Sequence, residues 1–116
     1  GPLGQKPDKP ERGAAGKAKG QMPIRRAANG QRCTLRLSGC RNDQDTVVLC
    51  HIRRFGWAGI SQKPHDLLGV FGCHFCHAVM DGRLRGECSD TDILRAHGET
   101  IMMLLHNGII RIDSDD

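Results

Sequence analysis

Apolar and polar positions alternate or recur along this chain in a way that predicts its main elements. Alternation over 33–37 predicts a short strand, and the β-branched run Thr46–Ile52 predicts the strongest strand of the chain. A third apolar run, Leu67–Phe71, predicts another short strand that leads into Gly72. Over Ile93–Leu105, Leu94 included, apolar residues recur at helical spacing, which predicts a helix packed against the core.

Turn and cap residues indicate where these elements begin and end. The basic segment Ile24–Asn29 predicts a short turn of helix that stops at the following glycine. Ser89 followed by Asp92 is a capping-box pattern at the start of the long helix, and Asn107–Gly108 ends that helix. Ile109–Ile112 predicts a last short strand. The expected fold is therefore a small α+β domain.

The composition allows only a thin core. Of 116 residues, 38% are hydrophobic and 3% aromatic, and small domains of this kind usually need disulfides or a bound metal. The sequence shows no secretory signal and no apolar run long enough to span a membrane. We therefore expect a soluble protein of the cytoplasm, where clustered cysteines bind metals more often than they form disulfides.

The net charge of +4 is unevenly distributed. Residues 1–32 hold eight Lys/Arg and two acids, a net of +6, whereas residues 33–116 hold nine and eleven, a net of −2. The first four residues resemble the remnant of a cleaved tag, so we expect 1–23 to be that remnant and a disordered basic arm. The domain then spans 24–112, with an acidic tail over 113–116. Such an arm suits attraction to phosphate backbones, and a solvated tail without a partner is the alternative.

Four of the six cysteines form two pairs around the expected hairpin. Cys33 and Cys40 precede the strong strand, and Cys73 and Cys76 follow the next strand at the start of a helix. Two such pairs can bind one tetrahedral Zn²⁺ with bonds of about 2.3 Å. A helix N-terminus also favours anionic thiolates. We predict a structural zinc ion of the treble-clef type, with disulfides as the alternative.

Two histidines and a carboxylate suggest hydrolytic chemistry. His51 ends the strong strand, and His77 and Asp81 lie one helical turn apart on a shared face. Packing of the hairpin on the helix would bring His51 across from this pair. Phosphodiester hydrolysis uses this arrangement, because a neutral imidazole takes a proton from water while a divalent cation stabilises charge on the phosphate. Each residue alone has a structural explanation, so the inference depends on their combination.

The order of these motifs resembles the HNH (His-Me finger, ββα-metal) endonucleases. The matching stretches are Leu-Cys-His-Ile-Arg at 49–53, Lys-Pro-His-Asp-Leu-Leu at 63–68 and Cys-x-x-Cys-His-x-x-x-Asp at 73–81. The resemblance extends over about 24–112 and is nearer to the small YbcO-like nucleases of phages and prophages. It implies a treble-clef/ββα-metal zinc domain with an added C-terminal helix. The implied activity is metal-dependent endonucleolytic hydrolysis of DNA, with little sequence specificity, in phage or prophage DNA metabolism inside the bacterial host cell.

The resemblance also assigns roles to single residues. His51 matches the general base, and Asp66 stands where the family usually has an Asn that orients this base. His77 and Asp81 match the residues that hold the catalytic cation, Mg²⁺ or another divalent ion. Cys50 stands where the family often has an Asp or His ligand, and a thiolate binds Zn²⁺ well but Mg²⁺ poorly. This departure leaves the identity of the catalytic metal open.

The long loop after the strong strand supplies the candidate phosphate contacts. These are Arg53, Arg54 and Lys63, and the expected partner is DNA. Two other functions stay open at this stage. A non-catalytic, zinc-stabilised nucleic-acid-binding module is favoured by Cys50 in a ligand position. A thiol redox protein using the CxxC pair is the other, and one zinc ion per chain would contradict it.

Overall fold

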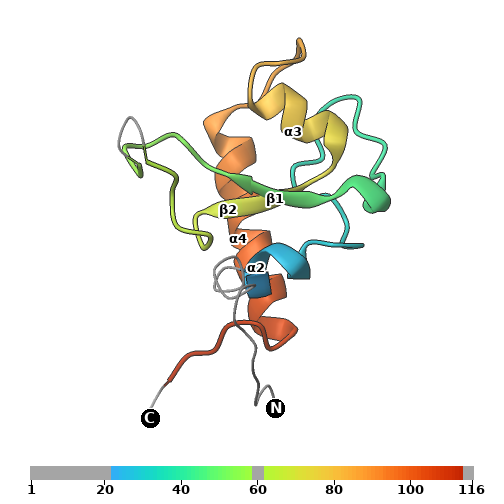
Figure 1. The fold of residues 1–116 in the computed structure, drawn as a ribbon. Helices are drawn as coiled ribbons and strands as arrows, with labels where there is room; N and C mark the ends of the chain where they lie inside the picture. The colour runs from blue at the N-terminus through green and yellow to red at the C-terminus, as the bar shows by residue number, and fades with distance from the viewer. Residues whose placement is uncertain (1–21, 59–61, 114–116) are drawn as a thin grey trace, which may run out of the picture.

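The computed structural model describes residues 22–58 and 62–113. In this part of the chain, three α-helices, one 3₁₀ turn and a two-stranded sheet form a small α+β fold (Figure 1). The elements in chain order are α2 (Met22–Ala27), η1 (Gln44–Thr46), β1 (Val48–His51), β2 (Gly69–Gly72), α3 (His74–Met80) and α4 (Asp90–His106). Residues 1–21 and 114–116, to which most of the expected basic arm and acidic tail belong, lie outside the described residues. No helix of the described part is long and apolar enough to cross a membrane.

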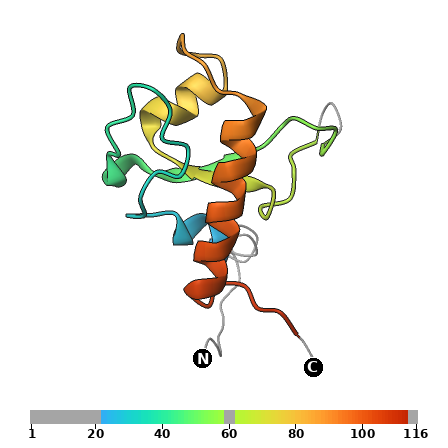
Figure 2. The same ribbon diagram turned by 180° about the vertical axis from the view of Figure 1, so that it is seen from behind.

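Strands β1 and β2 form an antiparallel hairpin, and α3 follows β2 directly. His51 pairs with Gly69 at one end of the hairpin, and Val48 pairs with Gly72 at the other. Helix α4 crosses one face of the sheet, behind it in Figure 1 and in front of it in Figure 2. The predicted strands at 46–52 and 67–71 therefore form, but each is shorter than expected.

The core lies between the hairpin, α3 and α4. Its largest fully buried side chains are Phe71, Leu35, Ile52, Ile93 and Leu104. The buried stripe of α4 consists of Ile93, Ala96, Thr100 and Leu104. The capping box at the start of α4 and the end at Asn107–Gly108 are confirmed. The core assignment of Leu94 is wrong, because Leu94 lies beside that stripe and is 50% exposed.

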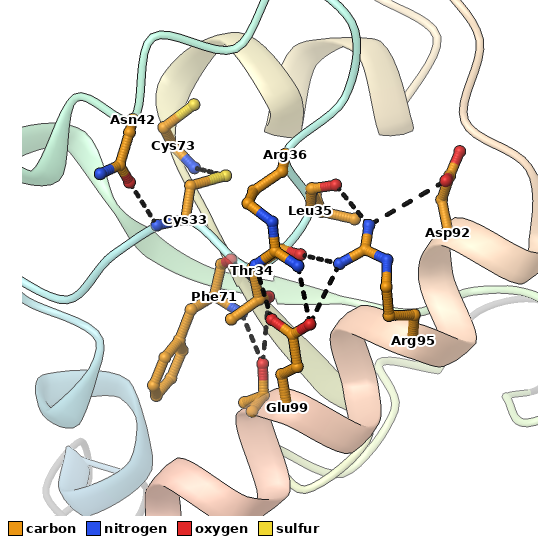
Figure 3. A network of polar contacts seen from close by, with 11 residues as sticks. Cys33, Thr34, Leu35, Arg36, Asn42, Phe71, Cys73, Asp92, Arg95 and Glu99 are labelled. Atoms are coloured by element: carbon orange, nitrogen blue, oxygen red, sulfur yellow. Dashed lines mark hydrogen bonds and ion pairs between the residues drawn. The ribbon is translucent and has the colours of Figure 1, made fainter.

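The strand predicted over 33–37 does not form. Arg36 has a φ of +42°, which interrupts an extended backbone. The carbonyls of Thr34 and Leu35 accept hydrogen bonds from the Arg95 guanidinium, both at 2.7 Å (Figure 3). The segment therefore gives these acceptors to a side chain of α4, and alternation alone does not reveal such a partner.

The strand predicted over Ile109–Ile112 is also absent from the described residues. The amides of Ile109 and Ile110 donate to the Leu104 carbonyl, at 2.9 and 3.3 Å. These bonds satisfy one of the carbonyls left free at the C-terminus of α4. The apolar residues after this helix thus complete its cap and do not add to the sheet.

Candidate functional site

Four cysteine thiols lie together at one end of the sheet. Two come from the segment before the β1–β2 hairpin and two from the segment after it. The sulfur atoms of Cys33, Cys40, Cys73 and Cys76 all lie within 4.8 Å of one another. Cys40 Sγ and Cys73 Sγ are 3.8 Å apart, which matches the separation of about 3.8 Å expected for tetrahedral Zn–S bonds of about 2.3 Å. A disulfide requires about 2.05 Å, and these cysteines are free. The predicted clustering of the four cysteines is confirmed.

Backbone amides point at three of these sulfur atoms. The Cys33, Cys40 and Cys76 sulfurs accept hydrogen bonds at 3.3–3.4 Å, from the amides of Cys73, Asn42 and Leu37 respectively. Amide donors favour the thiolate, which is the form that binds a metal. The donor set and its surroundings therefore fit Zn²⁺.

Two of the four thiols, Cys76 and Cys33, have pKa values shifted in opposite directions. Burial raises the pKa of Cys76 far above its ordinary value. Burial acts in the same direction on Cys33, but amide donors from Arg36 and Cys73 outweigh it and lower the pKa of this thiol. Metal uptake at such a site displaces thiol protons, so its affinity falls as the pH falls.

The first two thiols lie on the segment Cys33–Cys40, a knuckle that depends on a tight turn. Gly39 has a φ of +94°, and a Cβ atom there would lie 2.7 Å from Cζ of Phe75. The Asn42 side chain closes the knuckle by accepting a hydrogen bond from the Cys33 amide at 2.8 Å. Cys73 is the N-cap of α3, so the second thiol pair occupies the helix start, as expected.

An ion-pair network fixes this knuckle to α4 (Figure 3). Arg36 donates two hydrogen bonds to Glu99, at 2.6 and 2.7 Å, and Arg95 lies 3.4 Å from the same carboxylate. The hydrogen bonds from Arg36 lower the pKa of Glu99, so this carboxylate stays ionised at neutral pH. The network holds the Cys33 segment against the helix that covers the sheet.

A second polar cluster lies at the other end of the hairpin. His51 Nε2 is 2.8 Å from Asp66 Oδ1, and the two side chains are 15% and 11% exposed. Arg25 of α2 contacts the same carboxylate, with Nε 3.2 Å from Oδ2 and Nη2 3.3 Å from Oδ1. Burial would raise the pKa of Asp66, but the hydrogen bonds from His51 and Arg25 outweigh it and hold that pKa below its ordinary value.

The contact with Asp66 determines which ring nitrogen of His51 carries the hydrogen. An ionised carboxylate can only accept, so the Nε2 atom of the ring carries the hydrogen. In the neutral ring, Nδ1 then has a free lone pair. His51 is thus arranged to accept a proton at Nδ1.

Sequence reasoning did not find Arg25. It identified the short basic helix around this residue, but it gave the side chain no role. Arg25 and Asp66 are 41 positions apart, and nothing local in either segment indicates the contact. Only the packing of α2 beside β1 brings them together.

His77 and Asp81 form the pair that their spacing predicts. His77 Nε2 is 3.1 Å from Asp81 Oδ2, and Arg83 Nη2 lies 3.3 Å from the same oxygen. Burial lowers the pKa of His77, the Asp81 charge opposes this, and the His51 charge contributes to the lowering. No other His, Cys, Asp or Glu of the described part joins this pair in a cluster of three ligands.

Cys50 does not act as a ligand in this arrangement. Its side chain is fully buried, with Sγ directed to the carbonyls of Val48 and Gly72 at 3.5 and 3.9 Å. Burial strongly raises its pKa, and the nearby Asp81 carboxylate adds to this effect. The thiol is therefore neutral and forms part of the core. Cys88 also lies outside the cluster, and burial raises its pKa.

The three basic residues of the loop lie in different surroundings. Arg54 pairs with Asp90 at 2.9 Å, and exposed Arg53 donates to the Gln62 carbonyl at 3.4 Å. Lys63 lines a cavity of about 370 Å³ next to Asp66. The cavity is lined by Pro23, Ile24, Arg25, Lys63, Pro64, His65, Asp66, Ile109 and Ile110.

Comparison with known proteins places this arrangement in a family. The family model described as "Putative nuclease YbcO" matches residues 22–107, which include both thiol pairs and both histidine–carboxylate pairs. The chain belongs to the YbcO family. Two members are "Putative nuclease YbcO" of Escherichia coli (strain K12) and "Putative nuclease ybcO" of Enterobacteria phage 82. Each is 33% identical to this chain over 96 residues, which cover 76% of this chain and 96% of the relative.

A solved structure is also similar. It is described as the structure of a "putative bacteriophage protein" from Escherichia coli K-12, and it has 30% sequence identity and a TM-score of 0.59. The match covers 74% of this chain and all of the other. This YbcO-family chain therefore shares its fold with that protein.

Proposed function

We propose that this YbcO-family protein is a divalent-metal-dependent endonuclease of the HNH (His-Me finger, ββα-metal) type, which hydrolyses DNA with little sequence specificity. The observation that carries the proposal is the hydrogen-bonded His51–Asp66 pair at the end of β1, in a hairpin that leads directly into α3 with its His77–Asp81 pair. The names of the relatives, which describe them as nucleases, support the same class of activity. Their phage and bacterial sources support a role in phage or prophage DNA metabolism in the host cytoplasm.

The order of elements supports this assignment. The hairpin β1–β2 followed directly by α3 has the connectivity of a ββα unit, and α4 is the added C-terminal helix. Zn²⁺ bound by Cys33, Cys40, Cys73 and Cys76 would join the knuckle to the start of α3, as in a treble clef. Such a metal stabilises the fold and takes no part in the reaction.

His51 is the proposed general base. Its Nδ1 atom takes a proton from the attacking water, and the Asp66 carboxylate stabilises the imidazolium that forms. Asp66 also keeps the ring in one orientation, because it accepts the hydrogen on Nε2. Both side chains are largely buried, so few other orientations are available to them.

His77 and Asp81 are the proposed ligands of the catalytic cation. Burial keeps His77 neutral near pH 7, and a neutral imidazole with a carboxylate suits Mg²⁺ less well than Mn²⁺ or Zn²⁺. A divalent cation there would supply positive charge beside the scissile phosphate and the departing oxygen. Arg83, next to Asp81, adds a further positive charge at this end of α3.

Basic residues outside the reacting centre supply affinity for DNA in this proposal. Lys63 and Arg53 are exposed and can reach phosphates, and Arg54 can do so only if it leaves its pairing with Asp90. The basic arm expected over residues 1–23 would add sequence-independent attraction.

The test is nicking of supercoiled plasmid with Mg²⁺, Mn²⁺, Zn²⁺ or EDTA. We expect metal-dependent nicking by the wild type, and a loss of about 10²–10⁴-fold in His51→Ala because the general base is removed. His106→Ala is the matched control, since His106 lies in the last turn of α4. Equal rates for His51→Ala and wild type would contradict the proposal.

A non-catalytic, zinc-stabilised nucleic-acid-binding module is the second candidate. The buried Cys50 favours it, because the residue before His51 offers no ligand to the His77–Asp81 pair. This candidate predicts one bound zinc ion and intact DNA binding, with no nicking under any of the four conditions. His51→Ala would then leave DNA binding unchanged.

A further inference from the structure

We propose that Arg25 is a positioning residue for His51. Acting through Asp66, its guanidinium fixes the orientation and hydrogen placement of the imidazole that serves as base. This inference rests on the proposed function, and it gives α2 a part in the active site that the sequence motifs do not indicate.

The geometry of the carboxylate is the first argument. Arg25 Nε lies 3.2 Å from Oδ2 and 3.4 Å from Oδ1 of Asp66, and Nη2 lies 3.3 Å from Oδ1. A planar guanidinium that engages both oxygens restricts rotation of the carboxylate. Oδ1 is therefore held toward His51 Nε2, 2.8 Å away. Without Arg25, the carboxylate could rotate and the imidazole could turn with it.

The charge balance is the second argument. Asp66 is only 11% exposed, and a carboxylate at such a site needs a counter-charge to stay ionised. The groups that face it are His51 from β1 and Arg25 from α2, and Lys63 and His65 of its own loop line the same cavity. Arg25 supplies this counter-charge and helps to hold the pKa of Asp66 below its ordinary value, so the acceptor of the His51 hydrogen bond stays ionised.

Two other roles for Arg25 make different predictions. If Arg25 only fastens α2 to the loop that carries Asp66, its removal lowers stability and leaves the pH dependence of the reaction unchanged. If its 32% exposed side chain is a phosphate ligand, its removal raises KM and leaves kcat unchanged. A positioning role instead acts on kcat and on the ionisation of Asp66, and so on the pH dependence of the reaction.

The experiment compares Arg25→Gln and Arg25→Lys with Arg26→Gln in the zinc-loaded full chain. Arg26 is the exposed neighbour on α2, so its replacement removes the same charge without touching Asp66. We expect Arg25→Gln to lower kcat for plasmid nicking by about 10–100-fold, the usual effect of losing a supporting partner of a reactive side chain. KM should stay within about twofold, and the acid limb of the pH–rate profile should move to higher pH, because the pKa of Asp66 rises when the Arg25 charge is lost.

Arg25→Lys should recover part of kcat, because it keeps the charge but loses the two-pronged contact. Arg26→Gln should match the wild type in kcat, KM and pH profile. A wild-type kcat and pH profile in Arg25→Gln would overturn the inference, as would a loss confined to KM. Should Arg25→Gln fail to fold by circular dichroism, Arg25→Lys decides by the same kcat and pH criteria.

A second readout does not depend on activity. Nitrogen-15 NMR of the histidine rings should show a single Nε2–H tautomer for His51 in the wild type and in Arg26→Gln. In Arg25→Gln it should show a mixture of the two neutral tautomers. If the wild type nicks no plasmid, the proposed function fails, and the NMR result still decides whether Arg25 orients His51. An unchanged tautomer in Arg25→Gln would overturn the inference even if nicking is confirmed.

Discussion

At the scale of single residues, Gly39 shows how tightly the Cys33–Cys40 knuckle is packed. Its φ of +94° disfavours any side chain, and Phe75 occupies the space that a Cβ atom would need. Gly82 provides a comparison, because its φ of +78° is similarly unfavourable but nothing lies within 4 Å of an added Cβ. The two glycines therefore separate backbone strain from steric conflict.

Gly39→Ala should lower the free energy of unfolding by about 1–3 kcal/mol from backbone strain, with a further loss from the contact with Phe75. Gly82→Ala should lose about 1–2 kcal/mol, from strain alone. Urea unfolding of both zinc-loaded variants measures the difference. Equal losses would mean that the ring of Phe75 moves away without cost.

At the scale of elements, the cysteine cluster joins the Cys33–Cys40 segment to the start of α3, and the hairpin between them is too short to hold the two together by itself. The sheet has two strands of four residues each, and an isolated hairpin is marginally stable at best in water. Zinc bound at such a site contributes about 10–16 kcal/mol of apparent free energy in zinc-finger peptides. This contribution is as large as or larger than the free energy of unfolding of a typical small domain, so removal of the metal should unfold the protein.

Cys73→Ser should therefore abolish stoichiometric zinc and the cooperative thermal transition, and chelation of wild-type zinc should do the same. Cys88→Ser, which alters a cysteine outside the cluster, should keep one zinc ion per chain. Elemental analysis and circular dichroism measure both effects. A metal-free protein with a native, cooperative transition would contradict this prediction.

Several elements of the fold could be predicted from the sequence, and others could not. The four clustered cysteines, the long capped helix and the two hairpin strands follow from local spacing, periodicity and cap residues. The strand at 33–37 was wrong because Arg95, on a helix about 60 positions away, takes the carbonyls that a neighbouring strand would use. Arg25 escaped detection for the related reason that its partner, Asp66, is supplied only by tertiary packing. Long-range ion pairs leave no periodic pattern in either segment.

At the scale of the whole molecule, charge separates the two ends of the chain. Residues 1–21 contain five Lys/Arg and two acids, whereas residues 33–116 are slightly acidic overall. In the proposed function, the reacting centre and the source of non-specific affinity are therefore different parts of the chain. Each can be altered without the other.

Deletion of residues 1–21 should weaken binding to duplex DNA and flatten its salt dependence. Each lost phosphate contact should reduce the slope of log K against log salt by about 0.9, so the loss of five basic residues should reduce it by at most about 4.5. Fluorescence anisotropy between low and physiological salt measures the slope. The nicking rate at saturating DNA should stay unchanged, and an unchanged slope would show that the arm does not contact DNA.

The position of the four thiols along the chain also has a consequence for biosynthesis. Cys33 and Cys40 leave the ribosome before Cys73 and Cys76, and neither pair alone completes a tetrahedral zinc site. β1 likewise has no partner until β2 emerges, and α4, which covers the sheet, is made last. A nascent chain that ends before these segments therefore exposes apolar strand residues and reactive thiols together. We therefore expect folding to be a late event that, with zinc bound at the cluster, depends on the supply of zinc at that moment.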